Sequence, residues 1–265
     1  MKAVPPMNSG ALFWYSRPME HAPRVAVYAN HELLSRAAAD RVAAIITQKP
    51  NAVLCLPTGN TPTRTYELLA ERFRRGEFIT SDLTVVKLDE WGGLTVDDPS
   101  TCEAYLQKNV IVPLEIQSER YISFRSDSPD PEKEAARIQG LITLRTFDLT
   151  LLGLGLNGHV GLNEPHQESG PVHVAHLDAT TLQHSMLRGT RGVHYGLTIG
   201  FDDILRSENI VMLVSGANKR EQLRAMLTEE ISPAHPATRL RESANLQIMA
   251  DSAAAPGGEF SKLSH

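Results

Sequence analysis

Cysteine is scarce in this sequence, with two residues, Cys55 and Cys102, among 265. Two cysteines cannot build a disulfide framework, and Cys55 lies in an apolar stretch typical of a buried strand, so we expect a reducing compartment. Long apolar runs are absent as well. No stretch approaches the roughly 20 apolar residues that a membrane span requires, and the N-terminal stretch lacks the apolar segment of a signal peptide. We therefore expect a cytoplasmic protein that has no membrane partner.

An excess of basic residues is also missing. The chain has 26 lysine and arginine residues against 31 acidic residues, which gives a formal net charge of -5. No basic stripe is interleaved with aromatic residues, as a nucleic-acid surface requires, so we expect no nucleic-acid partner. A small anionic ligand is not excluded, because helix termini and local sites bind anions at any net charge.

The motifs of several enzyme classes are absent too. The chain contains neither GxxxxGK[ST] nor GxGxxG, which counts against nucleotide binding, and it has no GxSxG, which counts against a serine hydrolase. Histidines gather in the second half, but their spacing matches no HExxH or Cys/His zinc pattern. We expect no metal, and we interpret these residues as a polar flap or surface: His166, His173, His176, His184 and His194.

What the chain does have is an alternation of short apolar segments and amphipathic helical segments. Apolar runs typical of strands occur at 24–28, 52–56, 83–88, 149–154, 195–200, 209–214 and 245–250, with a short edge element at 121–124. Helical spacing occurs at 31–48, about 63–75, 105–114 and 131–144. Strands separated by helices predict an α/β fold: a doubly wound, mostly parallel sheet in a Rossmann-like three-layer sandwich.

The composition fits one sizeable core, since 42% of the residues are hydrophobic and no repeat or linker divides the chain. We expect a proline-punctuated N-terminal arm at 1–23, a single domain at 24–250 and a flexible tail at 251–265. The segment at 169–191 has weak periodicity and predicts no defined element.

The most informative stretch is DLTLLGLGLNGHVGLNEP, at 148–165. Its apolar first half predicts a strand buried on both faces, and the glycines that follow let the backbone turn sharply and approach a ligand closely. Ligands of open α/β sheets bind beyond the carboxyl ends of the strands, so we predict a functional site in this loop. Its candidate residues are Asn157, Gly158, His159, Asn163 and Glu164.

Three further segments follow predicted strands. One is a turn before a helix, whose free N–H groups and positive dipole end suit a phosphate, although such turns are also common without a ligand. Its residues are Thr58, Gly59, Asn60 and Thr61. The second is Asp89-Glu90, which a helix cap or a solvated turn would explain equally well. The third contains Lys219 at a helix start, where the dipole disfavours a cation unless an anion is bound; taken alone, it is better explained as an ordinary surface lysine.

The segments PTGNTP at 57–62, KLDEW at 87–91 and GLGLNGHVGLNEP at 153–165 occur in this order at predicted strand ends. Together they resemble the glucosamine-6-phosphate deaminase family, and the resemblance extends from about 25 to 250. TCEAYL, ISFRSD and HLDATTLQH look most like the members called galactosamine-6-phosphate deaminase/isomerase. The related 6-phosphogluconolactonases share a GxGxDGH-like loop but lack the NEP at 163–165, which favours the deaminase branch.

The resemblance implies an enzyme that converts an amino-sugar 6-phosphate to a ketose 6-phosphate and ammonia, without an organic cofactor. By this resemblance, Asp89 moves a proton between C2 and C1 of the opened sugar, His159 opens the ring, and Glu164 orients or charges the imidazole. Thr58, Gly59, Thr61 and Lys219 match the phosphate pocket. The chemistry agrees, because ring opening needs a group that exchanges a proton near neutral pH and enolisation needs a separate base. We add Asn157 to the catalytic set, and Asn60, Glu90 and Gly158 to the substrate-binding set.

Two positions depart from the family pattern. Many relatives carry Asp where this chain has Asn157, and an amide can accept a hydrogen bond from the imidazole but cannot offer it a charge. Relatives of the glucosamine type place a phosphate-contacting arginine where this chain has Met186, and Arg188 and Arg191 are the candidates to replace it. The sequence leaves open the hexosamine epimer, any allosteric effector and assembly into a homo-oligomer.

Two other functions stay open. One is a hydrolase similar to the 6-phosphogluconolactonases, and the other is a non-catalytic sugar-phosphate sensor, since similar folds serve as effector domains of bacterial transcription regulators. Such regulators carry an added helix-turn-helix, which the short arm at 1–23 cannot supply. The retained Asp89, His159 and Glu164 favour an enzyme that acts on a sugar phosphate.

Overall fold

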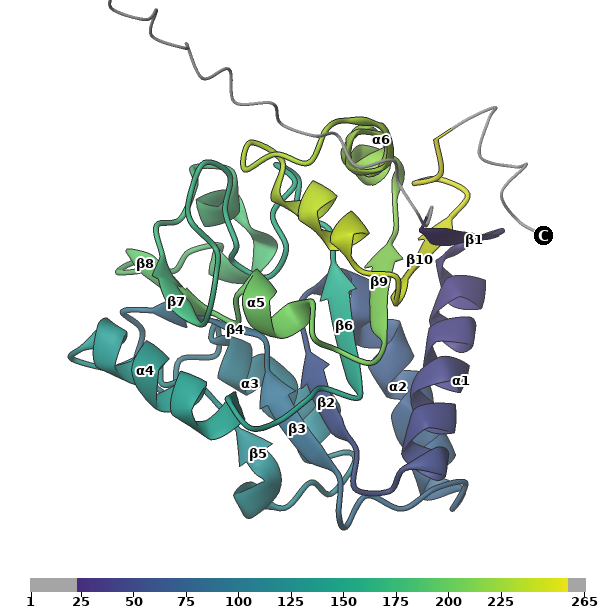
Figure 1. Cartoon of the computed structure of the whole chain (residues 1–265). Coiled ribbons are helices and arrows are strands. Elements are labelled where there is room, and N and C mark those ends of the chain that lie inside the picture. The colour runs from purple at the N-terminus through teal and green to yellow at the C-terminus, as the bar shows by residue number, and fades with distance from the viewer. Residues whose placement is uncertain (1–22, 257–265) are drawn as a thin grey trace, which may run out of the picture.

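The computed structural model describes residues 23–256, so residues 1–22 of the expected arm lie outside it. Its centre is a parallel sheet of seven strands in the order β1-β10-β9-β6-β2-β3-β5 (Figure 1). These strands are β1 (Arg24–Tyr28), β2 (Val53–Leu56), β3 (Thr84–Lys87), β5 (Tyr121–Ile122), β6 (Leu149–Gly153), β9 (Ile210–Val214) and β10 (Leu246–Asp251). The predicted mostly parallel α/β sheet is therefore confirmed.

Helices cover both faces of this sheet and complete the predicted three layers. One face packs on α1 (His31–Gln48), α2 (Asn60–Arg74) and α3 (Cys102–Leu106), and the other on α4 (Pro131–Ile142), α5 (Phe201–Ile204) and α6 (Arg220–Thr228) (Figure 1). Shorter helical turns are η1 (Gln107–Ile111), η2 (Ser118–Arg120), η3 (Thr181–Gln183), η4 (Ser185–Leu187), η5 (Ala217–Lys219) and η6 (Pro236–Glu242). Among the helices of residues 23–256, none has both the length and the apolarity to cross a membrane.

The core explains why the strands are continuous apolar runs. Successive side chains of a strand point to opposite faces, and here both faces are covered. Val211 and Leu213 of β9 belong to the core on the α1 and α2 side, whereas Met212 and Val214 belong to the core on the α4 side. A strand in this position has no solvated face, so it cannot alternate apolar and polar residues.

A second, smaller sheet corrects one prediction. The strand expected at 195–200 as part of the parallel sheet is β8 (Tyr195–Thr198), and it pairs antiparallel with β4 (Asp89–Gly92) and β7 (His173–Ala175). The chain leaves the main sheet after β3, bends at Leu88 and continues as β4, and the N–H of Ile199 donates to the Leu88 carbonyl at 2.9 Å. β4 takes up the hydrogen bonds of β8, which therefore lies outside the seven-stranded sheet.

Two helices begin earlier than their periodicity predicts. α2 begins at Asn60 rather than near 63, which places residues 60 and 61 in its first turn. The helix expected at 105–114 begins at Cys102, because the Thr101 hydroxyl accepts the Ala104 N–H at 3.0 Å as an N-cap, and it continues as the π-helical turn η1.

The folded part also extends past residue 250. The carboxylate of Asp251 accepts the Ser215 hydroxyl at 2.5 Å and the Ala254 N–H at 2.8 Å, and Ala254 is fully buried. Residues 252–256 of the expected tail are thus packed on the domain, and residues 257–265 lie outside the described part. Asp251 also fixes the chain as it leaves β9.

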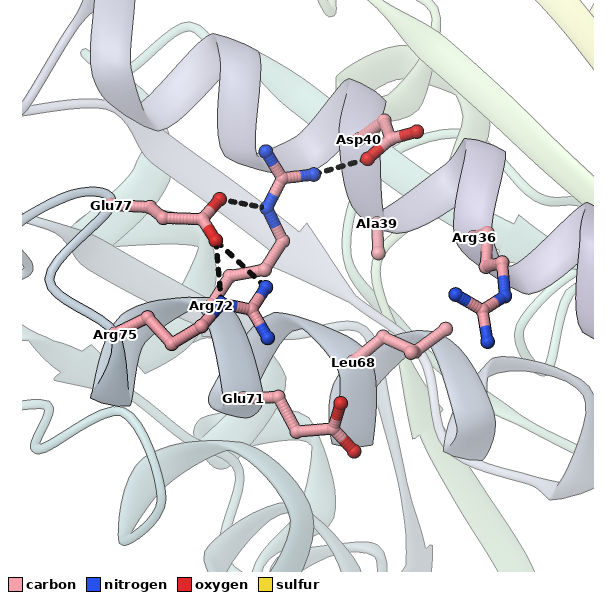
Figure 2. A pocket seen from close by; sticks show the side chains of 8 residues that line it. All are labelled: Arg36, Ala39, Asp40, Leu68, Glu71, Arg72, Arg75 and Glu77. Atoms are coloured by element: carbon pink, nitrogen blue, oxygen red, sulfur yellow. Dashed lines mark hydrogen bonds and ion pairs between the residues drawn. The ribbon is translucent and has the colours of Figure 1, made fainter.

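Most ion pairs of the described chain lie on exposed helix surfaces. Arg72 of α2 pairs with Asp40 of α1 and with Glu77, beside a hollow of about 220 Å³ between the two helices (Figure 2). Arg75 also points to Glu77 (Figure 2). No candidate site residue lines this hollow. Such pairs contribute little to stability, because water screens them.

The pair between Lys87 and Glu90 is different, because both side chains have no exposed surface. Lys87 donates to Glu90 at 2.6 Å, to Glu103 at 2.9 Å and to the Phe124 carbonyl at 2.9 Å. Glu90 also accepts the N–H groups of Cys102 and Glu103, so it caps the start of α3. The pair joins the end of β3 to β4 and α3.

We predict that Lys87→Met destabilises the protein by about 3–5 kcal/mol, because it leaves the Glu90 carboxylate buried without a cation. Arg36→Met is the control, because its pair with Glu32 is 58% and 41% exposed, and we expect it to cost about 1 kcal/mol or less. Urea unfolding measures both losses. Equal unfolding midpoints for the two variants would contradict a structural role for the buried pair.

Candidate active site

The candidate residues follow four strands that are neighbours in the sheet, β9, β6, β2 and β3. Lys219 comes after β9, His159 after β6, Thr58 after β2 and Asp89 after β3. Because these strands are parallel, their carboxyl ends lie at one edge of the sheet. This is the edge at which open α/β sheets bind ligands.

The loop after β6 is a tight turn that needs its glycines. The Gly155 N–H donates to the His159 carbonyl at 2.9 Å, and a Cβ at Gly155 would lie 2.4 Å from the imidazole ring. Gly158 has a positive φ of 86°, and a Cβ there would lie 2.8 Å from the ring of His235. Asn163 is buried and donates to the Val160 and Ile199 carbonyls, so its amide anchors the loop rather than facing a ligand.

The imidazole of His159 has two partners, and both lie at its Nδ1. Its Nδ1 is 3.0 Å from the Thr181 hydroxyl oxygen and 3.6 Å from Oε2 of Glu164. Burial raises the pKa of Glu164, but hydrogen bonding and charge attraction from His159 outweigh it and hold the pKa below its usual range. Glu164 is therefore an ionised, buried carboxylate at the Nδ1 side of the ring.

Asn157 supports Glu164 rather than the imidazole. Its amide nitrogen donates to Oε2 of Glu164 at 3.0 Å, and its amide oxygen accepts the backbone N–H of His159 at 3.2 Å. The amide thus orients the carboxylate and closes the loop. The hydrogen bond from the imidazole to this amide, which the sequence suggested, is not formed within the described chain.

Asp89 is the most perturbed acid at this edge. It is 8% exposed, and its Oδ1 has no hydrogen-bond partner within residues 23–256. Burial and the neighbouring Glu90 charge raise the pKa of Asp89 to about 7, while the Lys87 ammonium and a hydrogen bond from the Cys102 thiol oppose the rise. A carboxyl with this pKa is present in both protonation states near neutral pH, as a group that takes and returns a proton must be.

The side chain of Glu90 points away from that of Asp89. Adjacent residues of a strand point to opposite sides, so the Glu90 side chain enters the network with Lys87 and α3. It has no exposed surface. The expectation that Glu90 contacts substrate therefore finds no support in the geometry, which gives it a structural role beneath Asp89.

The turn after β2 ends at the first turn of α2. Gly59 precedes the helix with a φ of 102°, no side chain caps it, and the space beside its Cα is open. The Gly59 carbonyl accepts the hydroxyls of Thr63 and Tyr105 at 2.9 and 2.8 Å, which fixes the turn. The helix N-terminus formed by Asn60 and Thr61 thus offers N–H groups to an anion.

Lys219 ends the short turn η5, just before α6, rather than lying in the first turn of a longer helix. Burial lowers the pKa of Lys219 to about 8. No carboxylate of residues 23–256 forms an ion pair or hydrogen bond with it. An amine held this way is a cation without a counter-ion, which is a physical reason to expect an anionic ligand.

Two side chains that the sequence did not single out as site residues connect these segments. The Cys102 sulfur lies 3.6 Å from the Thr58 hydroxyl, and its thiol lowers the pKa of Asp89, so this residue connects the turn before α2 with the acid. Burial raises the pKa of Cys102, which keeps its thiol protonated and able to donate. His184, expected as part of a polar flap, packs on Trp91 of β4 with ring centroids 5.8 Å apart.

The pKa of His184 is also shifted by its surroundings. Burial lowers its pKa, and the positive charges of His159 and Lys219 lower it further. The side chain of Met186 packs against a small apolar cluster that includes Trp91, while Arg188 and Arg191 are exposed. In the described chain, no group of three or more His, Cys, Asp or Glu side chains is arranged to hold a metal ion.

Thr181, Cys102 and His184 carry no local signal that the sequence could have offered. Each contacts a residue at least 22 positions away in the chain, and none belongs to a glycine-rich turn. The segment that carries Thr181 and His184 has weak periodicity because it consists of the short turns η3 and η4.

Comparisons with known proteins agree with this geometry. The family described as glucosamine-6-phosphate isomerases/6-phosphogluconolactonase matches residues 29–249. A candidate deaminase named AgaI of Escherichia coli (strain K12) is 43% identical over 212 residues, which are 79% of this chain and 84% of that protein. Glucosamine-6-phosphate deaminase 1 of Bacillus subtilis (strain 168) is 34% identical over 85% of this chain and 95% of its own length.

Solved structures show the same relationship. A monomeric glucosamine-6-phosphate deaminase aligns with a TM-score of 0.83 at 33% identity and covers 87% of this chain and 98% of its own. A 6-phosphogluconolactonase from Leishmania guyanensis aligns with a TM-score of 0.70 over 89% of this chain and 98% of its own, but at 22% identity it shows the fold alone. The chain therefore belongs to the family of glucosamine-6-phosphate isomerases and 6-phosphogluconolactonases, and within it to the deaminases.

Proposed function

We propose that this protein is an isomerising deaminase of a hexosamine 6-phosphate, either galactosamine 6-phosphate or glucosamine 6-phosphate. Its products are the corresponding ketose 6-phosphate, tagatose or fructose 6-phosphate, and ammonia. The observation that carries the proposal is the buried Asp89, whose pKa is about 7 and whose Oδ1 has no hydrogen-bond partner among residues 23–256. Named deaminases among the relatives support the reaction class.

The proposed reaction divides between two groups. His159, with Glu164 on its Nδ1 side, exchanges a proton with the ring oxygen and opens the sugar to the aldehyde. Asp89 then takes the proton from C2 and returns it to C1, which converts the C2 amine to an imine. Water hydrolyses the imine to the ketone and ammonia. In the isomerisation O1 also gains a proton and the nitrogen loses one, and the hydrolysis adds water and breaks the C2–N bond, so neither step needs an electron acceptor.

The phosphate holds the substrate away from the reacting carbons. We assign it to the start of α2, at residues 58–61, and to the Lys219 ammonium across the strand ends. The α2 N–H groups and Lys219 both lack counter-charges among the described residues, and a phosphate dianion supplies two. Binding a remote group in this way converts binding energy into orientation of C1 and C2.

The two other functions are separable from this one. A lactonase would add water to a carbonyl without taking a proton from carbon, and a sensor would bind a sugar phosphate without turnover. The lactonase structures aligned here are at most 22% identical and support the fold only. Assays that measure ammonia, ketose and lactone hydrolysis therefore distinguish the three.

The first test is ammonia and ketose release from galactosamine 6-phosphate and from glucosamine 6-phosphate, with 6-phosphogluconolactone as the competing substrate. We expect Asp89→Asn to lower turnover by roughly 10²–10⁴-fold, because the proton shuttle is lost, while binding of the sugar phosphate changes little. Asp97→Asn, an exposed acid in the loop after β4, is the matched control. Release of ammonia from neither sugar, or full turnover by Asp89→Asn, would overturn the proposal.

The pH dependence follows from the same acid. Asp89 acts as a base only when ionised, so kcat/KM should fall as the pH drops below about 7. Cys102→Ala removes a hydrogen bond that lowers the pKa of Asp89, so this acid limb should move upward by about half a pH unit. Cys55→Ala, which removes the other buried thiol, should leave the limb in place. An acid limb that moves equally in both variants would assign it to another group.

The alkaline side should report on Lys219. The amine binds phosphate only while protonated, so KM should rise as the pH increases above about 8. Lys219→Met should raise KM by about 10- to 100-fold at pH 7, with a smaller change in kcat, and should flatten this alkaline rise. Lys133→Met removes an exposed lysine of α4 and should change neither quantity. An unchanged KM in Lys219→Met would remove this residue from the phosphate site.

A further inference from the structure

Thr181 is a buried residue in the turn η3 that contacts both members of the His159–Glu164 pair. Its side chain is 2% exposed, and its hydroxyl oxygen is 3.0 Å from Nδ1 of His159. Thr181 also helps to hold the pKa of the Glu164 carboxylate low, and that carboxylate faces the same ring nitrogen. The hydroxyl is thus nearer to the imidazole than the carboxylate is, since Oε2 of Glu164 lies at 3.6 Å.

The turn that carries Thr181 is held in place by its own contacts. The Asp178 carboxylate accepts the Thr180 N–H at 2.8 Å, and the Thr181 carbonyl accepts the His184 N–H at 3.0 Å. Hydrogen bonds of the residues before and after Thr181 therefore fix the position of its hydroxyl.

The ionised Glu164 carboxylate favours one direction for the hydrogen bond between Thr181 and His159. A threonine hydroxyl has one hydrogen to donate, and a buried ionised carboxylate can only accept. The negative charge of Glu164, with Oε2 3.6 Å from Nδ1, favours a proton on that nitrogen, and the Thr181 oxygen at 3.0 Å then accepts it. The proton of a neutral His159 must then be on Nδ1, which leaves Nε2 as the basic nitrogen.

We infer that Thr181 is a positioning residue for His159. Its hydroxyl accepts the hydrogen bond from Nδ1–H and holds the imidazole beside Glu164. Nε2 is then the nitrogen that exchanges a proton with the substrate. The inference rests on the proposed function for the identity of that substrate. It assigns to Thr181 the contact with the imidazole that Asn157 does not make, since the Asn157 amide is used by Glu164 and by the backbone of the loop.

The first test needs no substrate. In protein labelled with ¹⁵N-histidine, with the His159 signals assigned by comparison with His159→Gln, neutral His159 should carry its proton on Nδ1. Thr181→Val, which keeps the shape and removes the hydroxyl, should produce a mixture of the two tautomers. Thr181→Ser should keep the wild-type tautomer. A proton on Nε2 in the wild type, or an unchanged tautomer in Thr181→Val, would overturn the inference.

The second test uses turnover. Thr181→Val should lower kcat about tenfold or more with little change in KM, because a hydrogen bond that orients the imidazole is lost, and Thr181→Ser should restore most of it. Thr65→Val is the control, since Thr65 is fully buried and its hydroxyl has no partner within the described chain. Wild-type turnover in Thr181→Val together with a loss in Thr181→Ser would mean that the residue only fills space, and would overturn the inference.

The two tests also separate this inference from the proposed function. If the wild type releases no ammonia from either sugar phosphate, the proposed function fails, and the tautomer of His159 still decides the role of Thr181. If the wild type is active and Thr181→Val matches it in both tautomer and kcat, the inference fails while the proposed function stands.

Discussion

The buried contact between Lys87 and Glu90 is the interaction on which the edge of the sheet depends. It joins the end of β3 to β4 and, through the N–H groups of Cys102 and Glu103, to the start of α3. Because neighbouring residues of β4 point to opposite sides, burying Glu90 in this network directs Asp89 the other way. The same Lys87 charge opposes the rise in the pKa of Asp89. The Lys87–Glu90 pair therefore both connects these elements and affects the acidity of a candidate catalytic group.

Periodicity predicts the main sheet well because its strands have no solvated face. Residues 211–214, for example, form a continuous apolar run because both faces of their strand are buried. The second sheet is harder to predict, since Asp89 and Glu90 resemble a polar turn and become a strand only by pairing with β8. Pairing between segments about a hundred residues apart leaves no local pattern.

The candidate site divides along a similar line. Glycine-rich turns after strands predict Thr58, His159 and Glu164, because such turns have a local sequence signature. The partners of these residues come from elsewhere: Thr181 reaches the imidazole across 22 positions, and Cys102 reaches Thr58 across 44. Their types, a threonine and a cysteine, are ordinary in any core. Only their contacts with an imidazole and an acid give them a role.

Among residues 23–256, the strand ends hold several polar groups that lack a hydrogen-bond partner or a counter-ion. Lys219 is buried enough to lower its pKa to about 8, Asp89 is buried enough to raise its pKa to about 7, and Oε1 of Glu164 has no partner within residues 23–256. The pKa shifts of Lys219 and Asp89 each reflect a cost in folding free energy, since burial disfavours their charged forms. In the proposed complex, a phosphate dianion pairs with the Lys219 ammonium, and the Asp89 carboxylate takes the acidic proton from C2 of the sugar. The groups that weaken the free protein are therefore those that the proposed substrate would satisfy, which is the expected relation between strain and function at an active site.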